Sequence, residues 1–128
     1  MTRSVAAVLF GAVLLTAAAF AAAPPTVIPV VVTLAPDALV IGGPGEWVTA
    51  HTDIRYSIVD RLSVELGGVS AYSVYPDNRG YMVAKFHRVE IESIVSPPSA
   101  TLTLTGCTVD GVRFAGSDTI RVMNSQKK

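Results

Sequence analysis

The chain has 128 residues, half of them hydrophobic, and its ten basic residues balance ten acidic ones. Because a neutral balance creates no strong field toward anions, nucleic acid and anionic lipid surfaces are disfavoured as partners. The length fits one domain with a single hydrophobic core.

The N-terminus has the features of a secretory signal peptide. Arg3 precedes an apolar run from Val5 to Phe20, and Ala19-Phe20-Ala21 places small residues where signal peptidase needs them. We predict cleavage after Ala21, since a cut two residues later would leave Pro24 directly after it. An uncleaved anchor is the less favoured alternative, because the run is alanine-rich and shorter than the ~20 residues that span a bilayer. The protein is therefore expected outside the cytoplasm, in the periplasm, at the cell surface or in the medium.

The chain is predicted to divide into three parts: the signal peptide 1–21, a folded domain 22–123 and a polar tail 124–128. Removal of the leader takes Arg3 away and leaves the mature protein with nine basic and ten acidic residues. No second hydrophobic segment follows, so we expect no membrane insertion once the leader is gone.

After the leader, short β-branched and aromatic runs alternate with turn residues every ~8–12 positions, which is typical of an all-β sandwich or barrel. Pro29 lies in the first run and favours an edge strand or a strand that changes sheets. The expected strands are 27–34, 38–41, 47–54, 62–66, 70–75, 81–86, 101–105 and 114–122, with a short helix at 88–95. Seven or eight strands in this length predict an immunoglobulin-like antiparallel β-sandwich.

Two local patterns refine this prediction. In 47–54 the even-numbered residues form the core face, and Trp47 on the other face is expected to cover the sheet rim or plug one end of the sandwich. Asp110-Gly111 favours a tight hairpin turn of the primed type between the last two strands.

The order of several short motifs resembles a family of small secreted domains found in bacterial and archaeal extracellular surface proteins. The matching segments are 32–39, GEWVT at 45–49, VAKFHR at 83–88, TLTG at 103–106 and GSDTIRV at 116–122. The resemblance implies a non-catalytic immunoglobulin-like accessory or repeat module. Relatives carry an aspartate-rich loop suited to calcium, but here 77–80 reads Asp-Asn-Arg-Gly, with one carboxylate, and we expect a plain turn.

Catalytic and metal-binding patterns do not emerge from the residues. His51 and His87 fall on different expected strands without ligand spacing, and no serine lies in a nucleophile-elbow motif. Glu90 and Glu92 are expected on a solvated helix face. We predict a protein that is not an enzyme and uses no cofactor or metal.

The sequence favours a structural or adhesion module that contacts a protein or glycan partner. The candidate contact residues are four tyrosines: Tyr56, Tyr72, Tyr75 and Tyr81. Ordinary strand surface is the alternative interpretation of these residues.

Self-assembly is the alternative function. The β-branched segment that contains Val27, Val30 and Val32 could join a neighbour's open sheet edge, as in donor-strand pairing. The single cysteine, Cys107, is expected to be a small buried strand residue, with an intermolecular disulfide as the second possibility.

Overall fold

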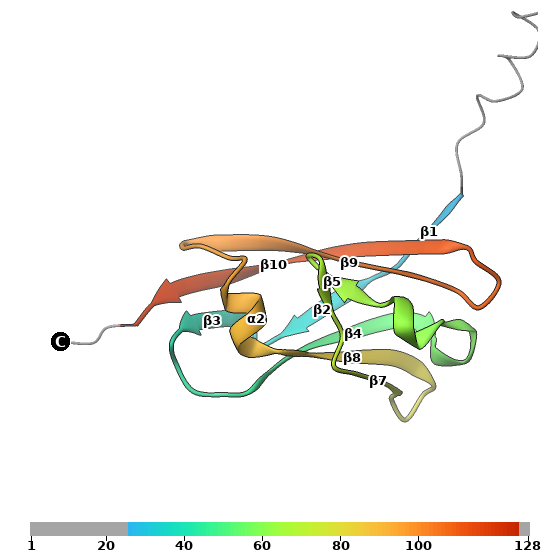
Figure 1. Ribbon diagram of the computed structural model, residues 1–128, viewed down its shortest axis with the longest axis horizontal. Helices are drawn as coiled ribbons and strands as arrows, with labels where there is room; N and C mark the ends of the chain where they lie inside the picture. The colour runs from blue at the N-terminus through green and yellow to red at the C-terminus, as the bar shows by residue number, and fades with distance from the viewer. Residues whose placement is uncertain (1–25, 126–128) are drawn as a thin grey trace, which may run out of the picture.

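The computed structural model describes residues 26–125 and consists of two packed β-sheets (Figure 1). One sheet contains β1 (Val27–Pro29), β3 (Ala38–Ile41), β5 (Glu65–Leu66), β6 (Val69–Ser70), β9 (Ser99–Cys107) and β10 (Arg113–Asn124). The other contains β2 (Val32–Ala35), β4 (Trp47–Arg55), β7 (Ser73–Pro76) and β8 (Tyr81–His87). The predicted all-β sandwich is confirmed, whereas the predicted leader and its cleavage site lie outside the described residues.

Between residues 26 and 125, three short helical segments join the strands. They are the 3-10 helices η1 (Tyr56–Ile58) and η2 (Arg61–Ser63) and the α-helix α2 (Arg88–Glu92). The short helix predicted at 88–95 is confirmed in its first five residues. The strand predicted to begin at Leu62 is wrong there, because the Asp60 side chain accepts the Leu62 N–H at 3.1 Å and caps a helical turn.

The N-terminal segment changes sheets after Pro29. β1 runs parallel to the start of β10, β2 pairs with β4 in the other sheet, and β3 returns to run parallel to the end of β10. The sheet switch predicted from Pro29 is confirmed. Most strand pairs are antiparallel, as expected, but residues 26–125 form ten strands instead of seven or eight, and β1 and β3 run parallel to β10.

Hydrogen bonds hold this crossing in place. The Val30 N–H donates to the Ala115 carbonyl, and the Val31 N–H donates to Asp53 Oδ1, both at 2.9 Å. The Leu34 N–H donates to Asp118 Oδ2 at 2.9 Å. The aspartate of the GSDTIRV motif therefore satisfies a backbone donor of the crossing chain.

A second crossing splits the strand predicted at 70–75. The Ala71 N–H donates to the Val64 carbonyl in one sheet, and the Tyr72 N–H donates to the Lys85 carbonyl in the other. Residues 70 and 73 consequently belong to different sheets, β6 and β7. In the sequence, the apolar positions change from odd at Val69 and Ala71 to even at Val74 across this point.

The β9–β10 hairpin forms where it was predicted, but its turn is of another type. The Gly111 N–H donates to the Thr108 carbonyl, and only Gly111 within the turn has a positive φ, of 87°. A primed type I turn needs a positive φ at two central residues. The predicted primed turn is therefore wrong, because Asp110 keeps a negative φ and only the glycine adopts the left-handed conformation.

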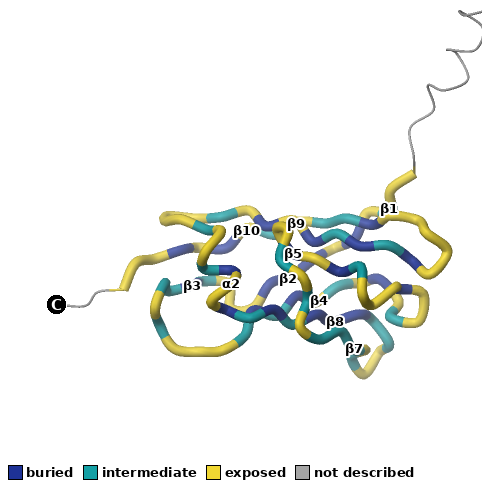
Figure 2. The backbone as a smooth tube through the Cα atoms, in the orientation of Figure 1, coloured by how far each residue is buried: buried dark blue, intermediate teal, exposed yellow. Residues whose placement is uncertain are grey.

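The hydrophobic core lies between the sheets, where Figure 2 shows buried positions along the inner strands. In β4, β8 and β9 the even-numbered residues face inward, as period-two patterning predicts. Phe86 and Phe114 are the largest side chains of the core, and both are fully buried. Gly106 makes room for the second ring, since a Cβ at this position would collide with Phe114.

Helix α2 is fastened to the β3–β4 loop. The Arg88 side chain is buried, donates to the carbonyls of Gly43 (2.6 Å) and Val40, and pairs with the Glu92 carboxylate at 2.6 Å. Ile91 inserts into the core on the same helix. These contacts fix the direction in which the helix presents its exposed residues.

Candidate functional site

Three aromatic rings pack together on the outer face of the four-stranded sheet. The Trp47 and His87 rings stack with centroids 4.9 Å apart at 29°. The Tyr72 ring lies 4.9 Å from the Trp47 ring and 4.7 Å from the His87 ring, edge-on to the latter. We call Trp47, Tyr72 and His87 the aromatic ridge.

Strand register and the second crossing bring these rings together. Trp47 begins β4, His87 ends β8, and the two residues are directly paired across the antiparallel strands. Tyr72 lies just before β7 and joins them because its N–H bonds the neighbouring strand at Lys85. The crossing thus leaves a tyrosine 63% exposed beside two strand residues that face outward.

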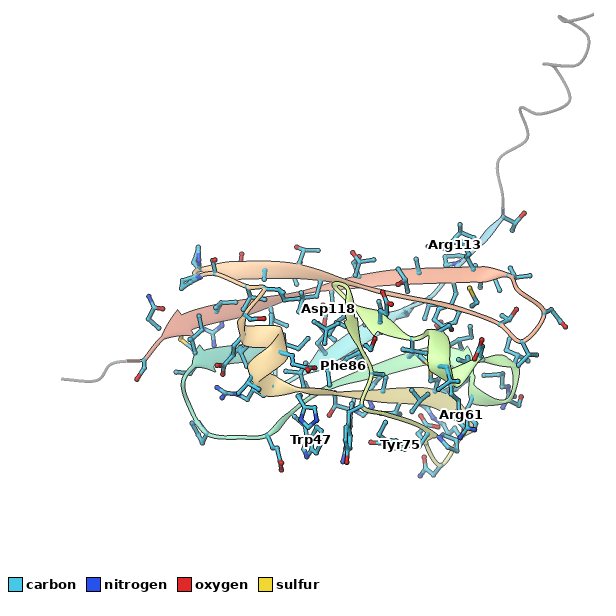
Figure 3. All side chains as sticks on the ribbon, viewed as in Figure 1. Trp47, Arg61, Tyr75, Phe86, Arg113 and Asp118 are labelled. Carbon is cyan, nitrogen blue, oxygen red and sulfur yellow. The ribbon has the colours of Figure 1, made fainter. Side chains whose placement is uncertain are left out.

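A lysine extends the ridge toward Tyr75. Lys85 Nζ lies 5.3 Å from the Trp47 ring centroid and 5.9 Å from that of Tyr75, within the range of cation–π attraction. Figure 3 shows Trp47 and Tyr75 on the outer side of their sheet, whereas Phe86 lies between the sheets. Val83, paired with Tyr75, is also on this outer face, yet it is only 1% exposed because neighbouring side chains cover it.

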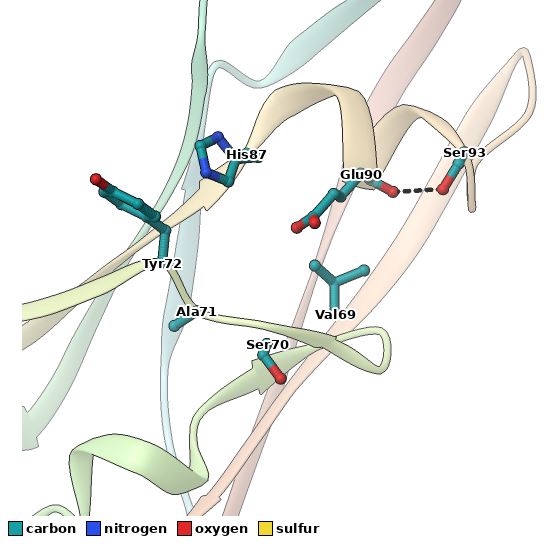
Figure 4. A pocket seen from close by; sticks show the side chains of 7 residues that line it. All are labelled: Val69, Ser70, Ala71, Tyr72, His87, Glu90 and Ser93. Atoms are coloured by element: carbon teal, nitrogen blue, oxygen red, sulfur yellow. Dashed lines mark hydrogen bonds between the residues drawn. The ribbon is translucent and has the colours of Figure 1, made fainter.

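A groove of about 530 Å³ opens beside the ridge (Figure 4). Tyr72 and His87 form part of its wall, and the remaining lining residues are Val69, Ser70, Ala71, Glu90 and Ser93. Helix α2 supplies Glu90, whose carboxylate lies in Figure 4 between His87 and Val69. Ser93 Oγ donates to the Glu90 carbonyl at 2.7 Å and closes the helix end.

Tyr72 separates this groove from a second hollow of about 330 Å³. Arg61, Leu62 and residues 71–74 line that hollow. Leu62 is 96% exposed there. The segment around Tyr72 therefore has a recess on each side, and the aromatic side chain stands between them.

The four predicted tyrosines do not form one surface. Tyr72 belongs to the ridge and Tyr75 is linked to it through Lys85, whereas Tyr56 is half-buried in η1 and packs on the core. Tyr81 lies at the other end of β8, where the guanidinium groups of two arginines each sit 5.5 Å from its ring. Of the four predicted contact residues, Tyr72 and Tyr75 therefore lie at or beside the aromatic ridge, and the other two lie elsewhere.

Sequence reasoning missed Trp47, His87 and Glu90 as parts of this site. Period-two alternation places Trp47 on the outer face, and this was the available signal. The pairing of Trp47 with His87 depends on the register between β4 and β8, which sequence does not state. Trp47 packs on the sheet face instead of plugging an end of the sandwich.

Cys107 is half-buried on the outward face of β9, so the expectation of a buried residue is wrong. It follows Thr101, Thr103 and Thr105 in the odd-numbered row, which faces away from the core. With Glu65 and Arg113 it lines a hollow of about 160 Å³. An intermolecular disulfide stays a prediction.

The two histidines do not form a metal site within residues 26–125. His51 is exposed in β4 and His87 belongs to the ridge; nowhere in residues 26–125 do three histidine, cysteine, aspartate or glutamate residues group together. Asp77 Oδ1 accepts the N–H groups of Arg79 at 2.8 Å and Tyr81 at 3.0 Å. The Tyr81 bond lowers the pKa of the Asp77 carboxyl, the Arg79 N–H and charge add to this, and partial desolvation opposes it.

The groove can bind through stacking and hydrogen bonding. It offers one aromatic wall, one imidazole, one carboxylate and two serine hydroxyls, all on a surface open to solvent.

None of the helices formed by residues 26–125 has the length and apolar character needed to cross a bilayer.

A scan against protein-family models and a search of curated proteins gave no match to this chain. The likeness to secreted surface-protein modules therefore continues to depend on its sequence motifs. The structure does give several of those motif residues a physical role, among them Gly106, Asp118 and Arg88.

Proposed function

We propose that this protein is a non-catalytic structural or adhesion module that works at or outside the cell envelope. It binds a protein or glycan partner through the aromatic ridge. The secretory location is supported by the leader sequence, and the binding role is supported by the ridge.

The mutual packing of three outward-facing rings, of which Tyr72 is exposed and Trp47 and His87 are half-buried, is the observation that carries this proposal. Tyr72 is 63% exposed although it contacts two other aromatic rings, so the ridge offers apolar area already held in a fixed geometry. A rigid aromatic surface loses little conformational entropy on binding, which is why tryptophan and tyrosine dominate binding hot spots. Self-assembly through the first strands has weaker support, since Val30 and Val32 are buried in the core of their own chain.

Ridge substitutions test the proposal. The chain beginning at Ala22 would be applied to a glycan array and to intact cells, and its affinity for the partners found would then be measured by surface plasmon resonance. We expect Trp47→Ala and Tyr72→Ala each to weaken binding by about 30-fold, as for a hot-spot residue. Tyr81→Ala is the matched control, because Tyr81 lies on the same sheet at the other end of β8.

The controls make the result decisive. Far-UV circular dichroism must show that each variant is folded, and Tyr72→Ala is the safer substitution because its side chain is mostly exposed. Equal binding by wild type, Trp47→Ala and Tyr72→Ala would contradict the proposal. Stronger loss in Tyr81→Ala than in the ridge variants would move the site to the other end of the sheet.

A further inference from the structure

We propose that the groove beside the aromatic ridge binds a pyranose ring of a neutral glycan. This inference rests on the proposed binding function and names the class of ligand for one part of its surface. Tyr72 and His87 belong to both the ridge and the groove, so a sugar seated in the groove would also contact the ridge.

The size and openness of the groove fit a small polar ligand. Its volume of about 530 Å³ lies within the ~300–1,000 Å³ usual for ligand pockets. The lining residues come from β6, from the crossing segment at 71–72, from the end of β8 and from helix α2 with the residue after it. Because the groove is open, we expect a weak affinity, with a Kd of about 0.1–1 mM.

The chemistry of the lining fits a sugar. A pyranose has apolar C–H faces and a rim of hydroxyl groups, so it needs an aromatic or aliphatic wall beside hydrogen-bonding groups. Tyr72 and Val69 supply apolar walls, and Glu90 and Ser70 supply oxygen atoms. Within residues 26–125 neither the Glu90 carboxylate nor the Ser70 hydroxyl has a hydrogen-bond partner, whereas the Ser93 hydroxyl is engaged with the Glu90 carbonyl.

The charge of the groove selects a neutral glycan over an acidic one. Glu90 is the one carboxylate among the lining residues, and neither lysine nor arginine lines the groove. A carboxylate accepts strong hydrogen bonds from hydroxyl groups but repels the carboxylate of a uronic or sialic acid. Lys85 lies over the Trp47 and Tyr75 rings and does not line the groove.

The groove is held in shape before any ligand arrives. The buried Arg88–Glu92 pair and its bonds to the β3–β4 loop fix helix α2, and the N–H bond of Tyr72 to β8 fixes the opposite wall. A preformed site avoids the entropy that a mobile loop would lose on binding.

Titration calorimetry with defined oligosaccharides tests the inference. The neutral probes are maltohexaose, cellohexaose, chitohexaose and a galacto-oligosaccharide, and the acidic probes are oligogalacturonate and sialyllactose. We expect the wild type to bind at least one neutral probe and to bind acidic probes at least tenfold more weakly. Glu90→Gln is expected to weaken neutral-probe binding about 5–10-fold, because a charge-assisted hydrogen bond is lost. The same substitution should reduce the difference in affinity between neutral and acidic probes, because the repelling carboxylate is gone.

Matched variants separate the outcomes. Asp110→Asn removes an exposed carboxylate in the β9–β10 turn, outside the lining of the groove, and should bind as the wild type does. Ser70→Ala should weaken neutral binding about threefold, and Tyr72→Ala at least tenfold. Failure of all neutral probes to bind, or unchanged affinity in both Glu90→Gln and Ser70→Ala, would overturn this inference. A protein partner lost on Tyr72→Ala but bound normally by Glu90→Gln would also overturn it, while leaving the proposed function intact.

Discussion

Asp77 organises the turn between β7 and β8 through its side chain. Its carboxylate accepts two backbone N–H groups, and its own N–H and C=O bond Tyr81 and Gly80. An aspartate that is engaged in this way stabilises the folded protein most when it is ionised. The loop that the family resemblance associates with calcium thus uses its single carboxylate for its own backbone.

The lowered pKa of Asp77 gives a pH-dependent prediction. Because the folded pKa lies below the ordinary value of 3.8, the stabilisation is complete above that value and is lost as the pH falls through the folded pKa. We expect Asp77→Asn to lower Tm by about 1–3 °C at pH 7. The difference from wild type should shrink as the pH falls below the ordinary aspartate pKa of 3.8, as measured by thermal melts over a pH series. A constant difference across that series would assign the effect to lost packing.

The first crossing, from β1 to β2, brings the backbone of the N-terminal segment into close contact with β10. Where the chain leaves β1 for β2, it passes directly over β10 at Gly116. A Cβ at this position would collide with the Val30 carbonyl and touch the Val32 side chain. Both contacts are with the segment 30–32. This segment cannot move away without breaking its backbone hydrogen bonds to Ala115 and Asp53.

Gly116→Ala should therefore destabilise the fold by about 3 kcal/mol or more. Gly42→Ala is the comparison, because a Cβ there meets nothing within 4 Å and the substitution strains only a backbone with φ of 79°. That strain costs about 1–2 kcal/mol. Urea denaturation of both variants measures the difference, and equal losses would show that the crossing tolerates a side chain.

At the scale of the whole molecule, the N-terminal segment bears on whether the protein is a monomer or exchanges strands with a neighbouring chain. β1 pairs with β10 over three residues, and Val27 is 46% exposed, so this strand is the more weakly held part of the segment. Val30 and Val32 lie in the core, and the crossing is fastened by side chains from β4 and β10. Within residues 26–125, Val30 and β2 therefore fill positions in the core of their own chain.

We expect the chain from Ala22 to be monomeric in light scattering at low and high concentration, with Cys107 kept reduced. Deletion of residues 22–30 should unfold it, because the deletion removes β1, the buried Val30 and one anchor of the crossing. A folded deletion variant that takes up an added peptide of residues 22–35, or oligomers that depend on this segment, would instead establish strand exchange. Cys107→Ser distinguishes such oligomers from disulfide-linked ones.

The sequence by itself determined the elements that depend on neighbours along the chain. Alternation of leucine and threonine in 101–105 placed the leucines in the core, and Pro29 favoured either an edge strand or a change of sheets. The short helix at Arg88 and the turn at 77–80 were also predictable, because periodicity and turn residues act locally. The leader and the non-catalytic role rest on sequence alone and remain predictions.

Only the tertiary structure decided how distant segments meet. The register between β4 and β8 pairs Trp47 with His87, and the crossing at 71–72 brings Tyr72 to both. Local pattern shows which face of a strand a residue occupies, but it does not show which residue of another strand lies beside it. The ridge and the groove with Glu90 arise from those long-range pairings, because register is set by packing of the two sheets as a whole.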